Sequence, residues 1–222
     1  YHQAFHEVTR KIYGDDWFSI SRAGTFGSQS LYSCVWPGDL ANNFADHTLG
    51  VGSPGVIGGL PAAVWGGINL GLVGFPFYGS DVGGFRKGTP EKNAFIRWAE
   101  FGALSPIMQL GGGGQHRPWA KPHDEETLHI LLDYARLHIS LFPYIYAHAA
   151  AAHETGAPLM RALPLHYSTD PRSYEAQHEY LFGGSLLVAP VVKDVDSRNI
   201  YLPKDAWIDF WTDEYFAGPM DL

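Results

Sequence analysis

The sequence is poor in cysteine, in long apolar runs and in clustered basic residues. The single Cys34 excludes an internal disulfide, so cysteine usage leaves the cellular compartment open. No apolar run reaches the length of a membrane span, and we therefore expect no membrane partner. A formal net charge of -8 argues against nucleic acid as a partner, because phosphate binding needs clustered Lys and Arg.

The sequence also lacks a methionine at its start and a recognisable end. Residue 1 is Tyr, and the chain stops after Gly218–Leu222. We therefore expect a fragment of a longer protein. No leader peptide is visible, which in a fragment says little about localisation.

Aromatic residues, in contrast, are abundant, with seven Trp and twelve Tyr among 222 residues. Their rings offer flat apolar platforms on which sugar rings stack, although core packing is the commoner use of such residues. Hydrophobic residues make up 45% of the chain, which is ample for a core. The length suits one barrel-sized domain or one and a half average domains.

The stretch Gly71–Phe85 gives the clearest prediction of a strand followed by a site residue. Its first half is almost continuously apolar, as in a strand buried on both faces of a parallel sheet. It then changes to Gly79-Ser80-Asp81, and an acid at the carboxyl end of such a strand is typical of barrel sites. Asp81 is therefore a candidate site residue, unless it only caps the following turn.

Three further segments repeat the pattern of a short strand followed by a polar side chain. They are Trp17–Ile20 with Arg22, Leu31–Trp36 with Asp39, and Pro106–Leu110 with His116. Strands of a barrel present their carboxyl ends to one mouth. We therefore expect these three side chains and Asp81 to converge on one ligand.

Helical patterns separate and follow these strands, at Tyr1–Tyr13, Gly59–Leu70, Glu91–Leu104 and Asp124–Thr155, the last interrupted at Pro143. Thr89 is expected to cap the third helix, with Pro90 in its first turn. His2 and His6 have a spacing that a metal site uses, but no further ligand accompanies them, which favours a solvated helix face.

Strands and helices alternate four times up to Trp119, which is half of an eightfold (β/α) barrel. Half a barrel cannot close. After Gly156 the pattern changes to short strands at Leu181–Val192, Asn199–Leu202 and Ala206–Trp211. A domain boundary near Gly156 and a β-rich module beyond it are therefore predicted. The glycines Gly111–Gly114 lack the lysine and hydroxyl of a phosphate-binding loop and indicate a flexible or closely approached loop.

Carboxylates among aromatic residues at a barrel mouth fit glycoside hydrolysis, in which one acid protonates the leaving oxygen and another attacks or activates water. The acid has to stay protonated near its working pH, which an apolar neighbour such as Trp36 favours. A metal-dependent hydrolase is the competing chemistry. The histidines are scattered without a paired-ligand motif, which favours the sugar interpretation.

An ordered set of motifs then resembles glycoside hydrolase family 31, the retaining α-glucosidases and α-xylosidases, over essentially the whole chain. The motifs are SRAGTFGSQ (21–29), WPGD (36–39), GSDVGGF (79–85), IRWAEFGALSPIMQL (96–110), HRPW (116–119), LFPYIYAHA (141–149) and LLVAPV (186–191). The resemblance implies the second half of a (β/α)8 TIM barrel over residues 1–155, and the start of a C-terminal β-sandwich over residues 156–222.

The resemblance also implies roles for single residues. Asp39 corresponds to the general acid/base, with Trp36 beside it in the sequence. Arg22 corresponds to a sugar contact of the innermost subsite, and Asp81 to an acid that holds sugar hydroxyls. Phe85, from the same motif as Asp81, is counted among the substrate-binding residues. The implied partner is an α-linked carbohydrate, and no cofactor is needed.

Two departures from the family pattern have consequences. A sugar-binding histidine usually follows the strand that ends at Leu110, and here Gly111 stands there. Either His116 takes over this role or the innermost subsite is remodelled. The family's aspartate nucleophile would precede Tyr1, so this chain alone is expected to be inactive. A non-catalytic sugar-binding half-barrel, a transglycosylase and a lyase stay open as alternatives.

Overall fold

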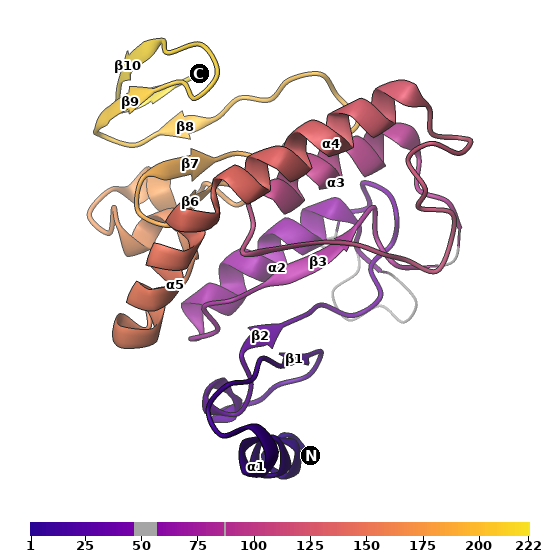
Figure 1. Cartoon of the computed structure of the whole chain (residues 1–222). Coiled ribbons are helices and arrows are strands. Elements are labelled where there is room, and N and C mark those ends of the chain that lie inside the picture. The colour runs from indigo at the N-terminus through magenta and orange to yellow at the C-terminus, as the bar shows by residue number, and fades with distance from the viewer. Residues whose placement is uncertain (47–56, 87) are drawn as a thin grey trace.

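The computed structural model of the chain describes residues 1–46, 57–86 and 88–222 (Figure 1). In its first part helices and strands alternate. In order, the elements are α1 (His2–Tyr13), β1 (Ile20–Ser21), a 3-10 turn (Ser28–Ser30), β2 (Cys34–Val35), α2 (Leu60–Leu72), β3 (Gly79–Val82), α3 (Lys92–Ala103), β4 (Ile107–Leu110), α4 (Glu125–Ser140) and α5 (Phe142–Thr155).

The strands of this part form one arc of parallel neighbours. β1 pairs with β2, and β3 pairs with β4, both in parallel. A parallel bridge between Val35 and Tyr78 joins β2 to the residue just before β3. The four strands thus stand side by side in chain order, and α3 packs against β3 and β4. This is part of a (β/α) barrel, as predicted.

The core lies between these strands and the helices outside them. Phe95, Trp98 and Phe101 of α3 are fully buried, as predicted from their spacing. The indole N–H of Trp98 donates to the hydroxyl of Ser80 over 3.0 Å. This bond anchors α3 on β3 and so fixes the strand that carries Asp81.

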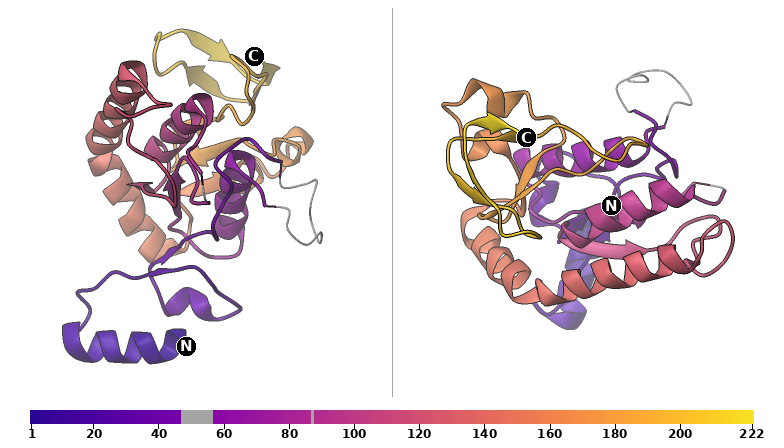
Figure 2. Two further views of the ribbon diagram at one scale, coloured as in Figure 1. Left: turned by 90° about the vertical axis from the view of Figure 1, so that its right-hand side faces the viewer. Right: turned by 90° about the horizontal axis from the view of Figure 1, so that it is seen from above.

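The part that follows is rich in antiparallel strands, which confirms the β-rich module predicted there. Its elements are β5 (Met160–Ala162), β6 (Tyr180–Phe182), β7 (Leu186–Val188), β8 (Tyr201–Leu202), β9 (Ala206–Ile208), β10 (Tyr215–Ala217) and β11 (Met220–Asp221), with 3-10 turns at Leu163–Leu165 and Pro171–Tyr174. β5, β6 and β7 form one sheet, whereas β8 pairs with β11 and β9 with β10. Figure 2 shows the last two pairs as a layer at the C-terminal end.

The two parts share one core. Met160, Tyr180 and Phe182 belong to the same buried cluster as the inner side chains of α2 and α3. The hydroxyl of Tyr180 also donates to the backbone carbonyl of Leu104 over 2.7 Å. The domain boundary between residues 155 and 156 therefore stays a prediction, because no gap in packing marks it.

The prediction for Gly71–Phe85 is wrong in the position of its strand. Residues 71 and 72 end α2, and the strand is Gly79–Val82, with Asp81 inside it. Two features of the apolar run interrupt a strand: Gly74 has a φ of 87°, and Pro76 has no N–H for a ladder. Within the run Phe75 and Tyr78 are buried beside the strands, whereas Leu72 and Val73 are exposed, so the apolar character reflects burial only in part.

Other boundaries also moved. The strand predicted at Trp17–Ile20 lies instead at Ile20–Ser21, and the strand predicted at Leu31–Trp36 shortens to β2. The strand predicted at Leu181–Val192 divides into β6 and β7 around Gly183, whose φ is 64°. The cap predicted at Thr89 is wrong, because α3 begins after Glu91, which has an extended backbone and makes no side-chain cap bond. Pro143 does lie in the first turn of α5, as predicted.

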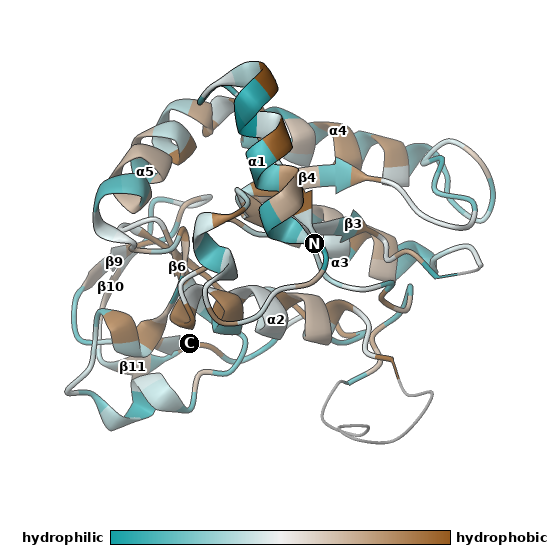
Figure 3. Ribbon diagram, turned by 90° about the horizontal axis from the view of Figure 1, so that it is seen from below, coloured by the Kyte–Doolittle hydropathy of each residue, from teal (hydrophilic) through white to brown (hydrophobic). Residues whose placement is uncertain are grey.

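The first helix differs from the others because it buries none of its residues. Its apolar side chains Phe5, Val8 and Ile12 have the predicted spacing, yet they are exposed. Figure 3 shows hydrophobic patches along α1, and Figures 1 and 2 show α1 at one extremity of the molecule. Across the described residues, no helix combines the length and apolarity that a bilayer crossing requires.

Candidate active site

Arg22 and Asp39 meet at the end of β1 and β2. Arg22 follows β1 directly, and Asp39 follows β2 after a short turn. Because the two strands are parallel neighbours, both side chains leave the sheet at the same edge, and an Nη of Arg22 forms an ion pair with Asp39 Oδ1. The pair is open to solvent, with side-chain exposures of 55% and 44%. Both groups are therefore within reach of a ligand.

Asp81 occupies a very different environment on β3. Its side chain is buried, and each carboxylate oxygen accepts one neutral donor. The indole N–H of Trp36 donates to Oδ2 over 3.1 Å, and the amide of Gln109 donates to Oδ1 over 3.3 Å. In the parallel pair of β3 and β4, Asp81 lies in register with Gln109. The carboxylate is therefore held from two neighbouring strands.

The position of Trp36 depends on a glycine in β3. A Cβ built on Gly79 would lie 2.3 Å from the Trp36 ring and 2.9 Å from Ile107, both too close for any side chain. Only glycine therefore lets the indole lie across β3 and reach Asp81. Trp36, expected from the sequence beside Asp39, thus donates its indole N–H to Asp81 instead.

Two ionisable side chains close to the Asp81 carboxylate, Tyr78 and Cys34, are buried and neutral. Burial raises the pKa of the Tyr78 hydroxyl, and the nearby Cys34 and Asp81 raise it further. Tyr78 donates instead to the backbone carbonyl of Ala63 over 2.9 Å. Burial also raises the pKa of the Cys34 thiol to about 12, so Cys34 is a packing residue and no nucleophile.

His116 lies under the loop that follows β4. Its Nε2 is 2.8 Å from the backbone carbonyl of Gly84, and its buried Nδ1 has no hydrogen-bond partner among the residues that the structure describes. A Cβ on Gly112 would lie 2.0 Å from the His116 ring. The closely approached glycine loop that the sequence predicts is therefore present, and the histidine is packed against it.

Phe85 connects three loops of the site. Its backbone N–H donates to the carbonyl of Leu40 over 3.1 Å, and its carbonyl accepts the N–H of Gly113 over 2.7 Å. The ring itself is partly exposed. The loops after β2, β3 and β4 are thus tied together beside Asp39 and Asp81.

The structure therefore brings the predicted residues together in two groups, Arg22 with Asp39 and Trp36 with Asp81, while His116 packs under the adjoining loop. Sequence reasoning missed Gln109, which holds Asp81. Each of these two residues is the next to last of its strand, but only the register of β3 and β4 shows that they face each other. Within the described ranges, no group of three or more His, Cys, Asp or Glu is placed to hold a metal ion, and His2 instead contacts the hydroxyl of Ser21 at 3.3 Å.

Two sequence families match the chain in the same order as the two structural parts. The pattern of the glycosyl hydrolases family 31 TIM-barrel domain matches residues 1–148. The pattern of the glycosyl hydrolase family 31 C-terminal domain matches residues 156–222.

Curated proteins with related sequences include an isomaltosyltransferase from Sporosarcina globispora, 33% identical over 100% of this chain and 21% of its own length. Alpha-glucosidase 2 from Bacillus thermoamyloliquefaciens is 36% identical over 90% of this chain and 24% of its own length. The α-xylosidase of Saccharolobus solfataricus is 30% identical over 97% of this chain and 28% of its own length. The chain thus spans between a fifth and a third of these relatives.

Solved structures agree in fold. A family 31 sulfoquinovosidase from E. rectale, bound to an aza-sugar inhibitor, superposes with a TM-score of 0.86 at 29% identity, over 100% of this chain and 32% of that one. An α-xylosidase from a soil metagenome, complexed with xylose, superposes with a TM-score of 0.84 at 27% identity, over 100% of this chain and 34% of that one. With both of its parts matched in order, this chain belongs to glycosyl hydrolase family 31.

Proposed function

We propose that this chain is the part of a retaining α-glycosidase that carries the general acid/base, and that the whole protein cleaves terminal α-glucosidic bonds of oligosaccharides. The observation that supports this most is the pair of differently held carboxylates, Asp39 and Asp81, at the same ends of neighbouring parallel strands. Retaining glycosidases need one carboxyl group that exchanges protons, together with fixed groups that orient the sugar.

Asp39 is proposed as the group that exchanges protons. It is open to a ligand, and its partner Arg22 is a side chain that also binds hydroxyls. An ion pair uses the carboxylate form, whereas protonation of the leaving oxygen uses the acid form. In this proposal, substrate hydroxyls replace Asp39 at the guanidinium of Arg22. Once released from the pair, the Asp39 carboxylate takes up a proton from solvent. It donates this proton to the leaving oxygen while the nucleophile attacks the anomeric carbon, and it later accepts a proton from the attacking water.

Asp81 is proposed to accept hydrogen bonds from sugar hydroxyls. Each of its oxygens uses one acceptor site for Trp36 or Gln109 and keeps further capacity. Because the carboxylate is already fixed, little ordering accompanies substrate binding, and such bonds lower the barrier where they tighten in the transition state. Trp36 is proposed as a positioning residue, and Phe85 and His116 as parts of the wall of the same site.

The nucleophile is proposed to come from outside these 222 residues, since the chain spans 21% to 28% of the curated relatives named above. In a retaining enzyme the nucleophile's carboxyl group lies about 5 Å from the acid/base. We also propose residues 1–155 as the barrel domain and residues 156–222 as the start of a β-sandwich. Glucosides are proposed as substrates because relatives named α-glucosidase and isomaltosyltransferase align over 90% and 100% of the chain.

The test is Asp39→Asn in the intact protein that contains these residues. Turnover of aryl α-glucosides with poor leaving groups is expected to fall about 10²- to 10⁴-fold, and turnover of those with good leaving groups far less. Asp133→Asn is the matched control, because Asp133 is also exposed and paired with an arginine, Arg136 at 2.9 Å. Equal turnover of poor leaving groups by the Asp39 variant and this control would contradict the assignment. Sugar binding without turnover by the unaltered protein would point to a non-catalytic binding module.

A further inference from the structure

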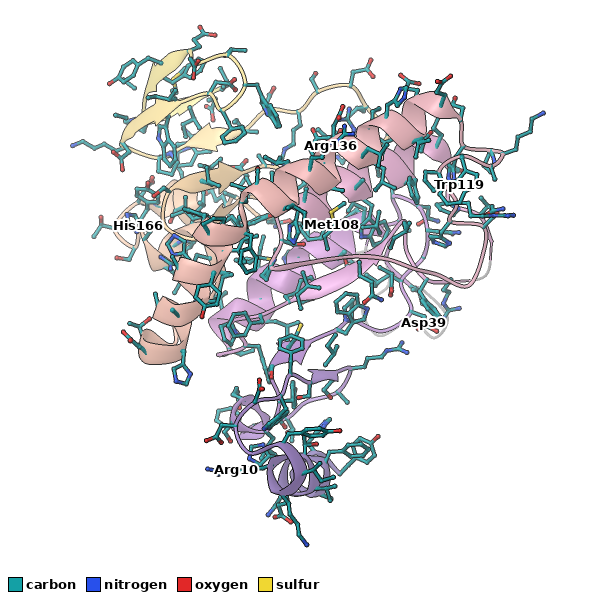
Figure 4. All side chains as sticks on the ribbon, viewed as in Figure 1. Arg10, Asp39, Met108, Trp119, Arg136 and His166 are labelled. Carbon is teal, nitrogen blue, oxygen red and sulfur yellow. The ribbon has the colours of Figure 1, made fainter. Side chains whose placement is uncertain are left out.

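The loop between β4 and α4 forms an open groove, and of its lining residues the proposed roles use His116 alone. The residues that line the groove are Leu110, Gly111, Gly112, Gly114, Gln115, His116, Arg117 and Trp119. Figure 4 shows Trp119 and Asp39 on the same side of the molecule, where the strands of the arc end. The groove therefore faces the side of the molecule that carries the candidate active site.

The groove begins beside Asp81. A Cβ built on Gly111, at its inner end, would lie 3.5 Å from Asp81 Oδ1. Because Gly111 has no side chain, no atom of this residue stands between the Asp81 carboxylate and the groove. A molecule that binds at Asp81 can therefore continue into the groove.

The floor of the groove is fixed in place. A Cβ on Gly114 would lie 1.6 Å from the carbonyl of Gly88, and the N–H of Gly113 donates to Phe85 over 2.7 Å. His116, 8% exposed, bonds through Nε2 to Gly84. The loop thus presents a preformed surface, and binding to it requires little ordering of the chain.

Two groups on this surface, Arg117 and Trp119, are suited to a ligand. Gln115 Oε1 accepts both the backbone N–H and the Nε–H of Arg117, over 3.0 and 2.8 Å. This fixes the guanidinium, whose terminal nitrogens have no hydrogen-bond partner in the described part of the chain. Trp119 is 64% exposed and offers a flat aromatic face.

We infer that this groove binds the pyranose ring on the leaving-group side of the scissile bond, with Trp119 as stacking platform and Arg117 as hydroxyl donor. The inference rests on the proposed function and extends it to substrate length. An aromatic face next to fixed N–H donors suits a neutral sugar ring, whose faces are apolar and whose edge carries hydroxyls. The groove therefore favours substrates with at least one sugar ring beyond the bond that is cleaved.

The experiment compares two substrates of the intact protein that contains these residues. Isomaltotriose places sugar rings on the leaving-group side, whereas α-glucosyl fluoride places none there. For Trp119→Ala we expect kcat/KM for isomaltotriose to fall about tenfold, the size of one aromatic contact, with no change for the fluoride. Arg117→Gln is expected to give a smaller loss with the same selectivity.

Trp211→Ala is the matched control, because Trp211 is also 64% exposed but lies in the turn between β9 and β10. It should change neither value. If Trp119→Ala and Trp211→Ala give equal kcat/KM for isomaltotriose while the fluoride is turned over, the groove assignment is overturned and the proposed function stands. If the unaltered protein turns over neither substrate, the proposed function fails and the groove assignment falls with it.

Discussion

The ends of β2 and β3 each carry an aspartate, and the two carboxylates are built in opposite ways. The Asp39 side chain is 44% exposed, and among the described residues its carboxylate has one side-chain partner, the 55% exposed Arg22. Asp81 is 8% exposed, and two neutral donors from two different strands hold it. A group that exchanges protons needs access and changing partners, whereas a group that orients a ligand needs a fixed place. The difference in environment thus matches the difference in proposed role.

The largest expected effect on folding comes from Asp81→Ala. The variant leaves the indole N–H of Trp36 and the amide of Gln109 without their acceptor in a buried place. We expect the free energy of unfolding to fall by about 3 kcal/mol. Urea denaturation measures this loss. Asp81→Asn, which keeps one acceptor oxygen, should lose less, and equal losses for both variants would contradict the two-donor arrangement.

Trp36→Phe tests the same carboxylate from the other side of the bond. The ring stays in the space above Gly79, but the N–H that donates to Asp81 is gone. The expected loss is about 1.5 kcal/mol of unfolding free energy, because one hydrogen bond to a charged group disappears. In the intact protein, KM for α-glucosides should also rise. A variant as stable as the unaltered protein would show that the 3.1 Å contact contributes nothing.

A third carboxylate, Glu179 in the β-rich part, is buried like Asp81, and its burial makes the stability of the fold depend on pH. Burial raises the pKa of Glu179 above its ordinary 4.5, although Arg198 at 3.0 Å opposes the rise. The folded state therefore binds this proton more tightly than the unfolded state. The stability from this group is present below about pH 4.5 and is lost as the pH rises through the folded pKa.

The variant Glu179→Gln should remove this loss. Its amide oxygen can still accept the backbone N–H of Tyr201, which lies 3.2 Å from one Glu179 oxygen. Melting temperatures of both proteins, measured from pH 4 upward, should show a smaller downward trend for the variant. Parallel curves would mean that Glu179 does not titrate differently on folding.

The smallest effect on stability is expected from Arg22→Gln. Solvent screens the ion pair with Asp39, and exposed pairs contribute less than about 1 kcal/mol. Urea denaturation should therefore barely distinguish the variant from the unaltered chain, while binding of sugar by the intact protein should weaken clearly. A stability loss as large as that of Trp36→Phe would remove the contrast between the two carboxylates.

The sequence predicted the order of the strands in the arc because a distinctive polar residue marks the neighbourhood of each strand end, as Arg22 does for β1 and Asp39 for β2. It failed for Gly71–Phe85, because an apolar run is the same whether it ends a helix, fills a loop or forms a strand. Gln109 was missed because its role depends on lying in register with Asp81. Register between strands that are 28 residues apart is a property of the sheet and leaves no local signal.

The exposure of the first helix could not be predicted from the local sequence either. The spacing of Phe5, Val8 and Ile12 predicts an apolar helix face, and the structure has this face, but it is exposed. In the same way, the motif around Trp36 identified this tryptophan as a site residue, but the sequence did not show which carboxylate its indole N–H bonds to. The indole reaches Asp81 because Gly79 leaves room for the ring, and this close approach of two strands cannot be read from the local sequence.

The central claim, that Asp39 exchanges protons with leaving group and water, is tested most directly by azide rescue of Asp39→Ala in the intact protein. With α-glucosyl fluoride, whose departure needs little protonation, the covalent intermediate should form and persist for lack of a base. Azide, which needs no base, should then accelerate turnover and yield α-glucosyl azide with retained configuration. No acceleration by azide, or a product of β-configuration, would contradict the claim.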